Sequence, residues 1–341
     1  MKTLKDLIFR KLVLNRRKNR CIVFILLGIL VFISTTDFSG AQDSLDQGAK
    51  QPSSVTVKEG TEMLVDNAVQ LGVNWLKTGV GNNGPNWAKR IEFEFDLQED
   101  NEPVWSILTV QPLFQTDDKS RTYFTQLRLA RNHKFGDSRT TANLGLGYRQ
   151  LFNNNSLLLG ANAFFDYESD MDHTRIGGGL EAKWHNFDFF ANLYEATSDI
   201  RSYSNASGSG TEEALDGFDL ELTSQVPYLP WMRIRGKYYG YNSNQASDDI
   251  DGWSASTEMD LHPNMRLEFG ITDDNFSDGT LFARFTFQLA NNARPAATTK
   301  LVDDKPFEVR DMTEHSLDKV RRTNTIKVER VASGSITISR Q

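Results

Sequence analysis

The five histidines are the residues best suited to acid–base or metal chemistry, and their spacing indicates neither. None lies at the HxxxH or HxxE spacing of a metal site, and the set is His133, His173, His185, His262 and His315. His173 lies near Asp170 and Asp172, and the histidine could form an acid–base pair with one of these aspartates on a loop. We interpret this segment instead as the polar end of a loop beside Arg175. The sequence therefore predicts no catalytic residue, no metal site and no cofactor.

Other charged and glycine-rich groups favour structural roles. Three acidic clusters could bind divalent cations, but they lack the ligand spacing of a calcium loop. Solvated loops are the simpler interpretation for their members, Asp248, Asp249 and Asp251, Asp273, Asp274 and Asp278, and Glu212, Glu213 and Asp216. The row of Arg233, Arg235 and Lys237 could attract anions in a pore, but such rows more often pair with facing carboxylates. Glycines 177–179 open no helix, so they indicate close packing within a strand instead of a phosphate loop.

These side chains lie in a stretch where hydrophobic and polar residues alternate from residue 89 to residue 289. A period of two predicts β-strands. The segments that follow this period are 89–98, 104–114, 122–131, 140–150, 156–168, 174–184, 187–195, 217–225, 231–241, 252–260, 265–272 and 279–289. The long connections at 196–216 and 242–251 fall on one side of such a sheet and short turns on the other, as in a barrel whose chain starts in the periplasm.

The length of the strands and the nature of their second face distinguish a membrane barrel from a soluble sandwich. About ten residues tilted near 45° span the apolar band of an outer membrane, whereas sandwich strands are nearer five or six residues. Aromatic residues near the strand ends match the girdles of such barrels, and they are Trp105, Tyr148, Trp184, Trp231, Tyr241 and Trp253. We therefore predict an all-β fold, a twelve-stranded antiparallel transmembrane β-barrel at residues 89–289.

Charged residues on the second face are the candidates for lining the lumen. They are Glu92, Glu94, Arg149, Arg175, Glu181, Glu258 and Arg284. Buried charges need partners, and the polar segment 290–330 that follows the last strand could supply them. Eight strands enclose little more than their own side chains and sixteen leave a channel, so twelve should admit a polypeptide.

The N-terminus has the order of a secretory signal peptide. Eight Lys and Arg residues lie within residues 1–20, an apolar run follows from Cys21 to Ile33, and Ser39-Gly40-Ala41 supplies small residues for cleavage. The apolar run is shorter than the roughly 20 residues of a spanning helix. Cleavage after Ala41 would export the protein, remove its one cysteine and change the net charge from −7 to −13. This negative charge disfavours nucleic acid as a partner.

Between the signal peptide and the barrel, residues 42–88 are expected to form a periplasmic segment with one short helix. The helix is predicted at 61–77, where a broad apolar stripe ends before Gly79.

Short motifs of the strands occur in the order of a known barrel family. They are FTQ at 124–126, NLGLGYR at 143–149, GANAFFDY at 160–167, RIGGGLE at 175–181, NLY at 192–194, GFD at 217–219 and YYG at 238–240. The sequence VRRTNTIKVE follows the last strand at 320–329. Together these motifs resemble the inverse autotransporter β-domain of intimins and invasins, over about residues 61–330.

The resemblance implies a barrel with its N-terminus in the periplasm and a C-terminal linker at 290–330 that re-enters the lumen and carries a passenger to the surface. The linker residues singled out are Arg310, Arg321, Arg322 and Asn324. Two features depart from the family. Residues 42–60 are too short for the peptidoglycan-binding LysM module that often precedes the barrel. Residues 331–341 form only a short C-terminal tail where immunoglobulin-like passengers would follow.

The sequence therefore predicts a barrel that translocates and anchors a C-terminal surface segment, with adhesion depending on a missing or separate passenger that would bind a host or surface ligand. The alternative is a porin-like channel plugged by its tail, and an outer-membrane hydrolase is the third interpretation. Expected partners are outer-membrane lipid and lipopolysaccharide, the outer-membrane assembly machinery and periplasmic chaperones.

Overall fold

A computed structural model describes residues 85–99, 101–205, 208–245, 248–290, 294–307, 310–332 and 335–339. The expected signal peptide and the helix expected at 61–77 lie outside these residues. Across the described ranges, no helix has the length and apolar character needed to cross a membrane. A 3-10 turn, η2 (Ala88–Arg90), leads into the first strand.

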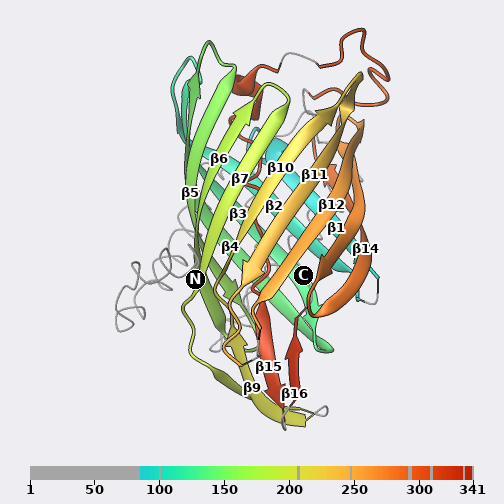
Figure 1. The fold of residues 1–341 in the computed structure, drawn as a ribbon. Coiled ribbons are helices and arrows are strands. Elements are labelled where there is room, and N and C mark those ends of the chain that lie inside the picture. Colours follow the sequence, from blue (N-terminus) through green and yellow to red (C-terminus); the bar gives the residue numbers. More distant parts are fainter. Residues whose placement is uncertain are drawn as a thin grey trace, which may run out of the picture. The chain divides into compact units, whose positions relative to one another are not determined.

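Twelve of the strands in the described residues close into an antiparallel barrel (Figure 1), which confirms the predicted fold class. Each strand pairs with its neighbour along the chain, except that β7 pairs with β10, and β1 pairs with β14 to close the cylinder. The barrel strands are β1 (Ile91–Gln98), β2 (Val104–Gln115), β3 (Arg121–Lys134), β4 (Asp137–Phe152), β5 (Leu157–Glu168), β6 (His173–Trp184), β7 (Phe187–Ala196), β10 (Gly217–Val226), β11 (Leu229–Tyr241), β12 (Ile250–His262), β13 (Met265–Asp274) and β14 (Ser277–Gln288).

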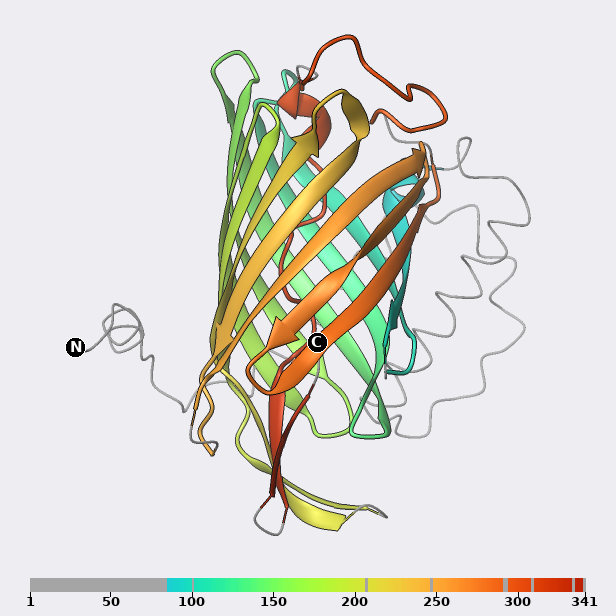
Figure 2. The same cartoon turned by 45° about the vertical axis from the view of Figure 1, so that its right-hand side comes forward.

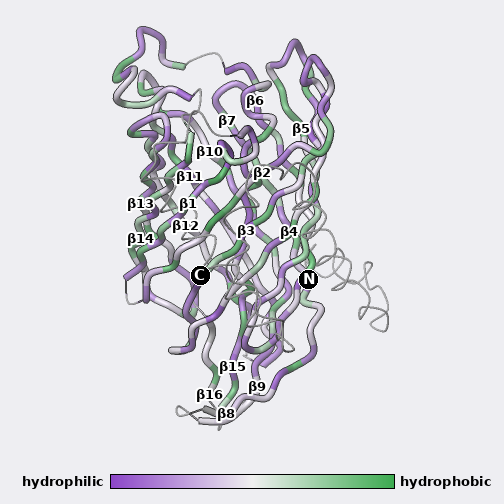
Figure 3. The backbone as a smooth tube through the Cα atoms, turned by 180° about the vertical axis from the view of Figure 1, so that it is seen from behind, coloured by the Kyte–Doolittle hydropathy of each residue, from purple (hydrophilic) through white to green (hydrophobic). Residues whose placement is uncertain are grey.

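The alternation read from the sequence separates an outer hydrophobic face from an inner polar one. In β10, Leu222 is 51% exposed on the outside, whereas Asp219 is 1% exposed on the inside. Figure 3 shows hydrophobic and hydrophilic residues alternating along the strands. Because successive side chains of a strand point to opposite faces, one register of pairing fixes the inner face of the whole barrel.

The aromatic girdle is present, but one of its expected members lies elsewhere. Trp184 and Trp253 are well exposed on the outer face. Tyr241 is fully buried inside, with its ring stacked 6.4 Å from that of Tyr194 and 6.1 Å from that of Tyr239. The girdle assignment of Tyr241 was wrong because this residue has the same alternation as Tyr239, which points inward.

After β14 the chain passes over one rim of the barrel and then through its interior (Figure 2). We call the rim where β1 begins the proximal rim and the opposite one the distal rim. Residues 294–307 cross the proximal rim, and Ala297, Asp303 and Met312 hydrogen-bond through their amides to its turns. The 3-10 helix η3 (Met312–His315) follows, and residues 316–327 run extended through the lumen.

A small sheet forms where the chain leaves the lumen. Strand β15 (Val328–Ala332) pairs antiparallel with β9 (Gly208–Ala214), and the flanking strands are β16 (Ser335–Ile338) and β8 (Arg201–Asn205). The connection expected at 196–216 is therefore a hairpin that receives the C-terminal segment at the distal rim (Figure 1).

Candidate functional site

The candidate site is the lumen wall that binds the extended part of the linker, residues 316–327. Wall side chains donate hydrogen bonds to main-chain carbonyls at several positions of the linker, which an extended chain away from a sheet would otherwise leave unpaired. Arg149 donates to the carbonyls of Ser316 (3.0 Å) and Asp318 (2.6 Å), and Arg175 donates to those of Thr323 (2.8 Å) and Thr325 (3.1 Å). Asn192 donates to the Arg321 carbonyl (2.9 Å), and Asn143 donates to the Asn324 carbonyl (2.8 Å). The lumen thus binds the linker backbone along its length.

One carboxylate joins two strands of the wall to the linker. Asp166 of β5 accepts hydrogen bonds from Arg175 of β6 (2.8 Å, Oδ2 to Nε) and from both terminal nitrogens of Arg322 (2.8 and 2.7 Å). All three side chains are buried. A buried carboxylate with two guanidinium partners leaves one excess positive charge, so this layer depends on further acceptors such as the Thr323 carbonyl.

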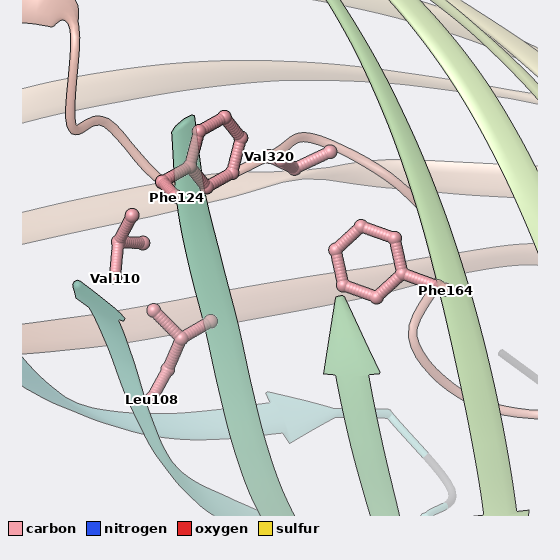
Figure 4. Close-up of a cluster of buried hydrophobic side chains, with 5 residues drawn as sticks. All are labelled: Leu108, Val110, Phe124, Phe164 and Val320. Atoms are coloured by element: carbon pink, nitrogen blue, oxygen red, sulfur yellow. The ribbon is translucent and has the colours of Figure 1, made fainter. Parts of the chain in front are cut away.

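Side chains of the linker contact several different strands of the wall. Lys319 pairs with Glu94 and with Glu92 (3.1 Å) of β1, and Arg321 pairs with Glu258 of β12. Val320 packs in a hydrophobic cluster with Leu108, Val110, Phe124 and Phe164 (Figure 4). Its amide also donates to the Gln126 side chain (2.7 Å).

Aromatic rings inside the lumen support three of the arginines. Arg149 lies 4.3 Å above the Phe124 ring, Arg322 lies 4.2 Å above Phe164, and Arg175 lies 4.3 Å above Tyr194. Cation–π contacts of this kind strengthen when water is excluded. A Cβ at Gly145 would lie 2.3 Å from the Phe164 ring, so only glycine there leaves room for the ring.

At the proximal rim, the linker is held by a second ionic group. Asp318 pairs with Lys183 (2.7 Å), with His315 (2.9 Å) and with Arg294. Arg310 pairs with Asp188 of β7 (2.8 Å), and its Nε donates to the His315 ring (3.2 Å). Both ends of η3 are thereby fixed to the wall before the chain enters the lumen.

At the distal rim, Glu212 of β9 is the centre of a buried network. Arg139 donates to both of its oxygens (2.5 and 2.9 Å), and Arg330 of β15 donates through Nε (2.9 Å). His173 lies 3.2 Å away through Nε2. Burial would raise the pKa of Glu212, but the hydrogen bonds and charges of Arg139 and His173 outweigh it and hold that pKa well below its usual range.

His173 also contacts a hydroxyl, which gives the outline of a serine–histidine–acid arrangement. The Ser198 Oγ lies 3.0 Å from Nδ1 of His173, whose other nitrogen faces Glu212. His173 begins β6 at the end of the connection that follows β5, two residues before Arg175, and it is fully buried in this network. Glu212 also accepts from Arg139 and Arg330, and His173 is fully buried, so a substrate does not reach the imidazole that would transfer the proton. The geometry favours a structural role.

Most of the predicted lumen residues contact the linker. Glu92, Glu94, Arg149, Arg175 and Glu258 do so directly, as described above. Glu181 accepts from Arg149 (2.6 Å) and so orients it. Arg284 is placed differently, because it pairs with Asp96 and Glu268 of the wall itself. Of the linker residues, Arg310, Arg321 and Arg322 pair with wall carboxylates, and Asn324 binds through its main-chain carbonyl.

Several key residues were not singled out from the sequence. Asp166 and Asp219 are further wall carboxylates that hold the linker, and Asp318 is a linker carboxylate that pairs with Lys183 of the wall. Thr323 donates to Asp219 through its amide (3.1 Å) and its hydroxyl (2.7 Å). The alternation of β5 could have indicated Asp166, because it shares a face with Asn162 and Glu168. The hydrophobic Phe164 on the same face obscured this signal.

The structure also places the basic row of β11 and the acidic clusters singled out from the sequence. Arg233 pairs with Asp188 (2.7 Å), Arg235 with Glu221 (2.7 Å) and Lys237 with Asp219 (3.3 Å), which confirms the expected pairing of the basic row. Within the residues that the structure describes, no group of three or more His, Cys, Asp or Glu side chains could hold a metal ion. The solvated-loop interpretation was wrong for Glu212, because the folded hairpin and β15 bury it.

Comparison with known proteins decides which family has this architecture. The family model described as the inverse autotransporter β-domain matches residues 44–324. The chain belongs to the inverse autotransporter β-domain family. Membership, together with the closed barrel, indicates an outer-membrane β-barrel, whose fold is consistent with contact to lipid. This family and fold are typically non-enzymatic.

Relatives of this inverse autotransporter domain include an attaching and effacing protein homolog of Escherichia coli K12, 29% identical over 160 residues, and the intimin of Escherichia coli O111:H-, 27% identical over 206 residues. The alignments cover 44% and 58% of this chain but only 48% and 21% of those relatives. A solved structure from work on the in-meso crystallization of membrane proteins shares the fold, with a TM-score of 0.55, 22% identity, and coverage of 71% of this chain and 100% of that one.

Proposed function

We propose that this barrel translocates and anchors its own C-terminal segment, which it holds at the cell surface after the segment has crossed the lumen. The observation that carries the proposal is the continuous set of wall contacts to residues 316–327. These contacts begin with Arg149 near the proximal rim and end with the pairing of β15 and β9 at the distal rim. A segment bound in this way is both threaded and fixed.

The orientation follows from the same proposal. The proximal rim would face the periplasm and the distal rim the outside, with a cleaved signal peptide at residues 1–41, a periplasmic segment at 42–88, the barrel at 89–289, the linker at 290–330 and the tail at 331–341. Export and insertion would depend on periplasmic chaperones and the assembly machinery. The names of the attaching and effacing homolog and of intimin suggest a role linked to adhesion, through a passenger that binds a host or surface ligand.

The contacts argue against an open porin as the working state. Extended residues 316–327 fill the lumen axis, and their charged side chains are paired with wall groups. Buried ion pairs cost several kcal/mol to break when one partner is left alone, so release of the linker from a resting barrel would be rare. A channel plugged by its tail predicts a large conductance once residues 290–341 are deleted, but that deletion alone does not establish surface display.

Surface accessibility of a C-terminal tag tests the proposal. An epitope placed after Gln341 should bind antibody on intact cells, and a second epitope inserted after Ala41 should bind only after permeabilisation. The two tags in one protein control for cell lysis. If the C-terminal tag is reached only in permeabilised cells while the barrel is folded, the proposed display function is wrong.

A further inference from the structure

Two cavities lie beside the linker inside the barrel. One of about 410 Å³ opens toward the distal rim, where Phe135 and Ser339 line it. The other, of about 350 Å³, opens toward the proximal rim, where Pro230 and Arg310 line it. Each is large enough to hold many water molecules. The linker therefore occupies part of the lumen and leaves space on either side of its midpoint.

The lining of both cavities is polar and charged, which favours hydration. Arg128 and Asn132 are among the side chains that line the distal cavity, and Gln225, Asp260 and Arg266 are among those that line the proximal one. A cavity of this size lined by polar groups normally holds ordered water that bridges those groups.

The boundary between the cavities is formed by two linker side chains. Lys319 and Arg321 are the charged residues that line both. Lys319 reaches across to Glu94 and Glu92 of β1, and Arg321 reaches to Glu258 of β12. These pairs face away from the wall that binds Arg322 and the linker carbonyls.

We propose that the barrel retains a pathway for small ions beside the bound linker, and that the ion pairs of Lys319 and Arg321 form its barrier. The proposal rests on the linker occupying the lumen, as in the proposed function. An ion moving between the two hydrated cavities must pass a layer of paired charges of both signs. Because these charges already bind one another, they do not compensate the ion for the water molecules that it loses. Removing the cations leaves Glu92, Glu94 and Glu258 in this layer, and removing the carboxylates leaves Lys319 and Arg321.

Charge removal at this layer should therefore both open the pathway and set its selectivity. The paired substitutions Lys319→Met and Arg321→Met keep most of the side-chain bulk while removing two positive charges. They should increase conductance several-fold and favour cations. The reciprocal pair Glu94→Gln and Glu258→Gln should also increase conductance and favour anions. A purely steric barrier would not reverse selectivity between these variants, because neither removes much volume.

Conductance of the purified full chain in planar bilayers, with a potassium chloride gradient, measures both effects. The native chain should conduct weakly, and the reversal potentials of the two variants should have opposite signs. Lys300→Ala, in the segment over the proximal rim, should behave as the native chain. Conductance unchanged in both variants, or reversal potentials of the same sign, would overturn the proposal. The Gln341 epitope on intact cells, measured for each variant, separates failure of the barrier from failure of linker display.

Discussion

Arg322 of the linker and Asp166 of β5 meet inside the barrel through two parallel hydrogen bonds of 2.8 and 2.7 Å. The residues are 156 positions apart in the sequence, and both side chains are buried. The Phe164 ring lies 4.2 Å from the same guanidinium. A planar, bidentate pair fixed on an aromatic face specifies one position of the linker along the lumen, which a flexible ammonium group would not do.

Replacing Arg322 should release the linker more readily without unfolding the barrel. Arg322→Ala leaves Asp166 with one guanidinium fewer and empties the face of Phe164, so linker docking should weaken by about 3 kcal/mol. Arg322→Lys should weaken docking less than Arg322→Ala does, because lysine keeps the positive charge but cannot form the two parallel hydrogen bonds of the guanidinium. Trypsin cleavage within residues 310–330 at increasing urea concentration measures this release. Lys300→Ala, which removes an exposed pair with Asp303, should change it by less than about 1 kcal/mol. Equal effects of Arg322→Ala and Lys300→Ala would contradict the expectation.

Two glycines of the barrel should differ sharply in their tolerance of a methyl group. A Cβ at Gly145 would lie 2.3 Å from the Phe164 ring, whereas at Gly178 the nearest atom is 4.0 Å away. Gly145→Ala should therefore displace Phe164 and weaken linker docking by about 1–3 kcal/mol, as overpacking does. Gly178→Ala should be nearly neutral. The same trypsin assay, with heat-modified gel mobility as a check on barrel folding, compares the two, and equal trypsin sensitivity would count against the packing described.

Attachment of β15 at the distal rim should depend on pH through Glu212. This carboxyl faces Arg139, Arg330 and His173, and its pKa lies below its usual range in the folded protein. The stabilisation from a depressed carboxyl pKa is complete above the unfolded value of about 4.3 and is lost as the pH falls through the folded value. A spin label at Thr337→Cys should therefore keep constant mobility from neutral pH to about pH 5 and become more mobile below about pH 4.

Glu212→Gln is the matched control for this pH dependence. The amide cannot ionise, so the acid transition in label mobility should disappear even if attachment is weaker throughout. An identical transition in this variant would show that another group governs attachment.

The Ser198–His173 contact should carry no hydrolytic chemistry. Arg139 and Arg330 both pair with Glu212, and the imidazole is fully buried between that carboxylate and the hydroxyl. A fluorophosphonate probe that reacts with activated serines should label neither the native barrel nor Ser198→Ala. Labelling of the native protein that disappears in Ser198→Ala would contradict the structural role and restore a hydrolase as an interpretation.

The strands could be predicted from the sequence because alternate side chains face the apolar membrane and the polar lumen. Leu222 and Asp219 illustrate this rule, and so does Arg149. Tyr241 shows its limit, because position near a strand end was weighted above alternation. Phe164 shows another limit, since a ring on the lumen face serves to support Arg322 and resembles a lipid-facing residue in sequence.

The site could be predicted only in part because its partners are far apart in the chain. The pairing of β15 with β9 joins Arg330 to Glu212 across 118 positions, and no local pattern specifies it. His173 is a similar case, because its partner Glu212 lies 39 positions away on the 201–214 hairpin. Arg284 is the opposite case, because its partners Asp96 and Glu268 belong to the wall and not to the linker. A charge on the lumen face therefore does not by itself predict a contact with the linker.

Proximity of the linker to the wall inside the folded barrel is the central claim, and covalent capture of Val320 tests it most directly. Val320 shares one hydrophobic cluster with Val110 of β2 (Figure 4). With Cys21 replaced by serine, the pair Val110→Cys and Val320→Cys should be bridged by a short bismaleimide in the folded full-length protein. Val320→Cys paired with Leu281→Cys, on the exposed outer face, should give only single adducts. A bridge between 110 and 320 supports a linker bound in the lumen, and single adducts in both proteins would contradict it.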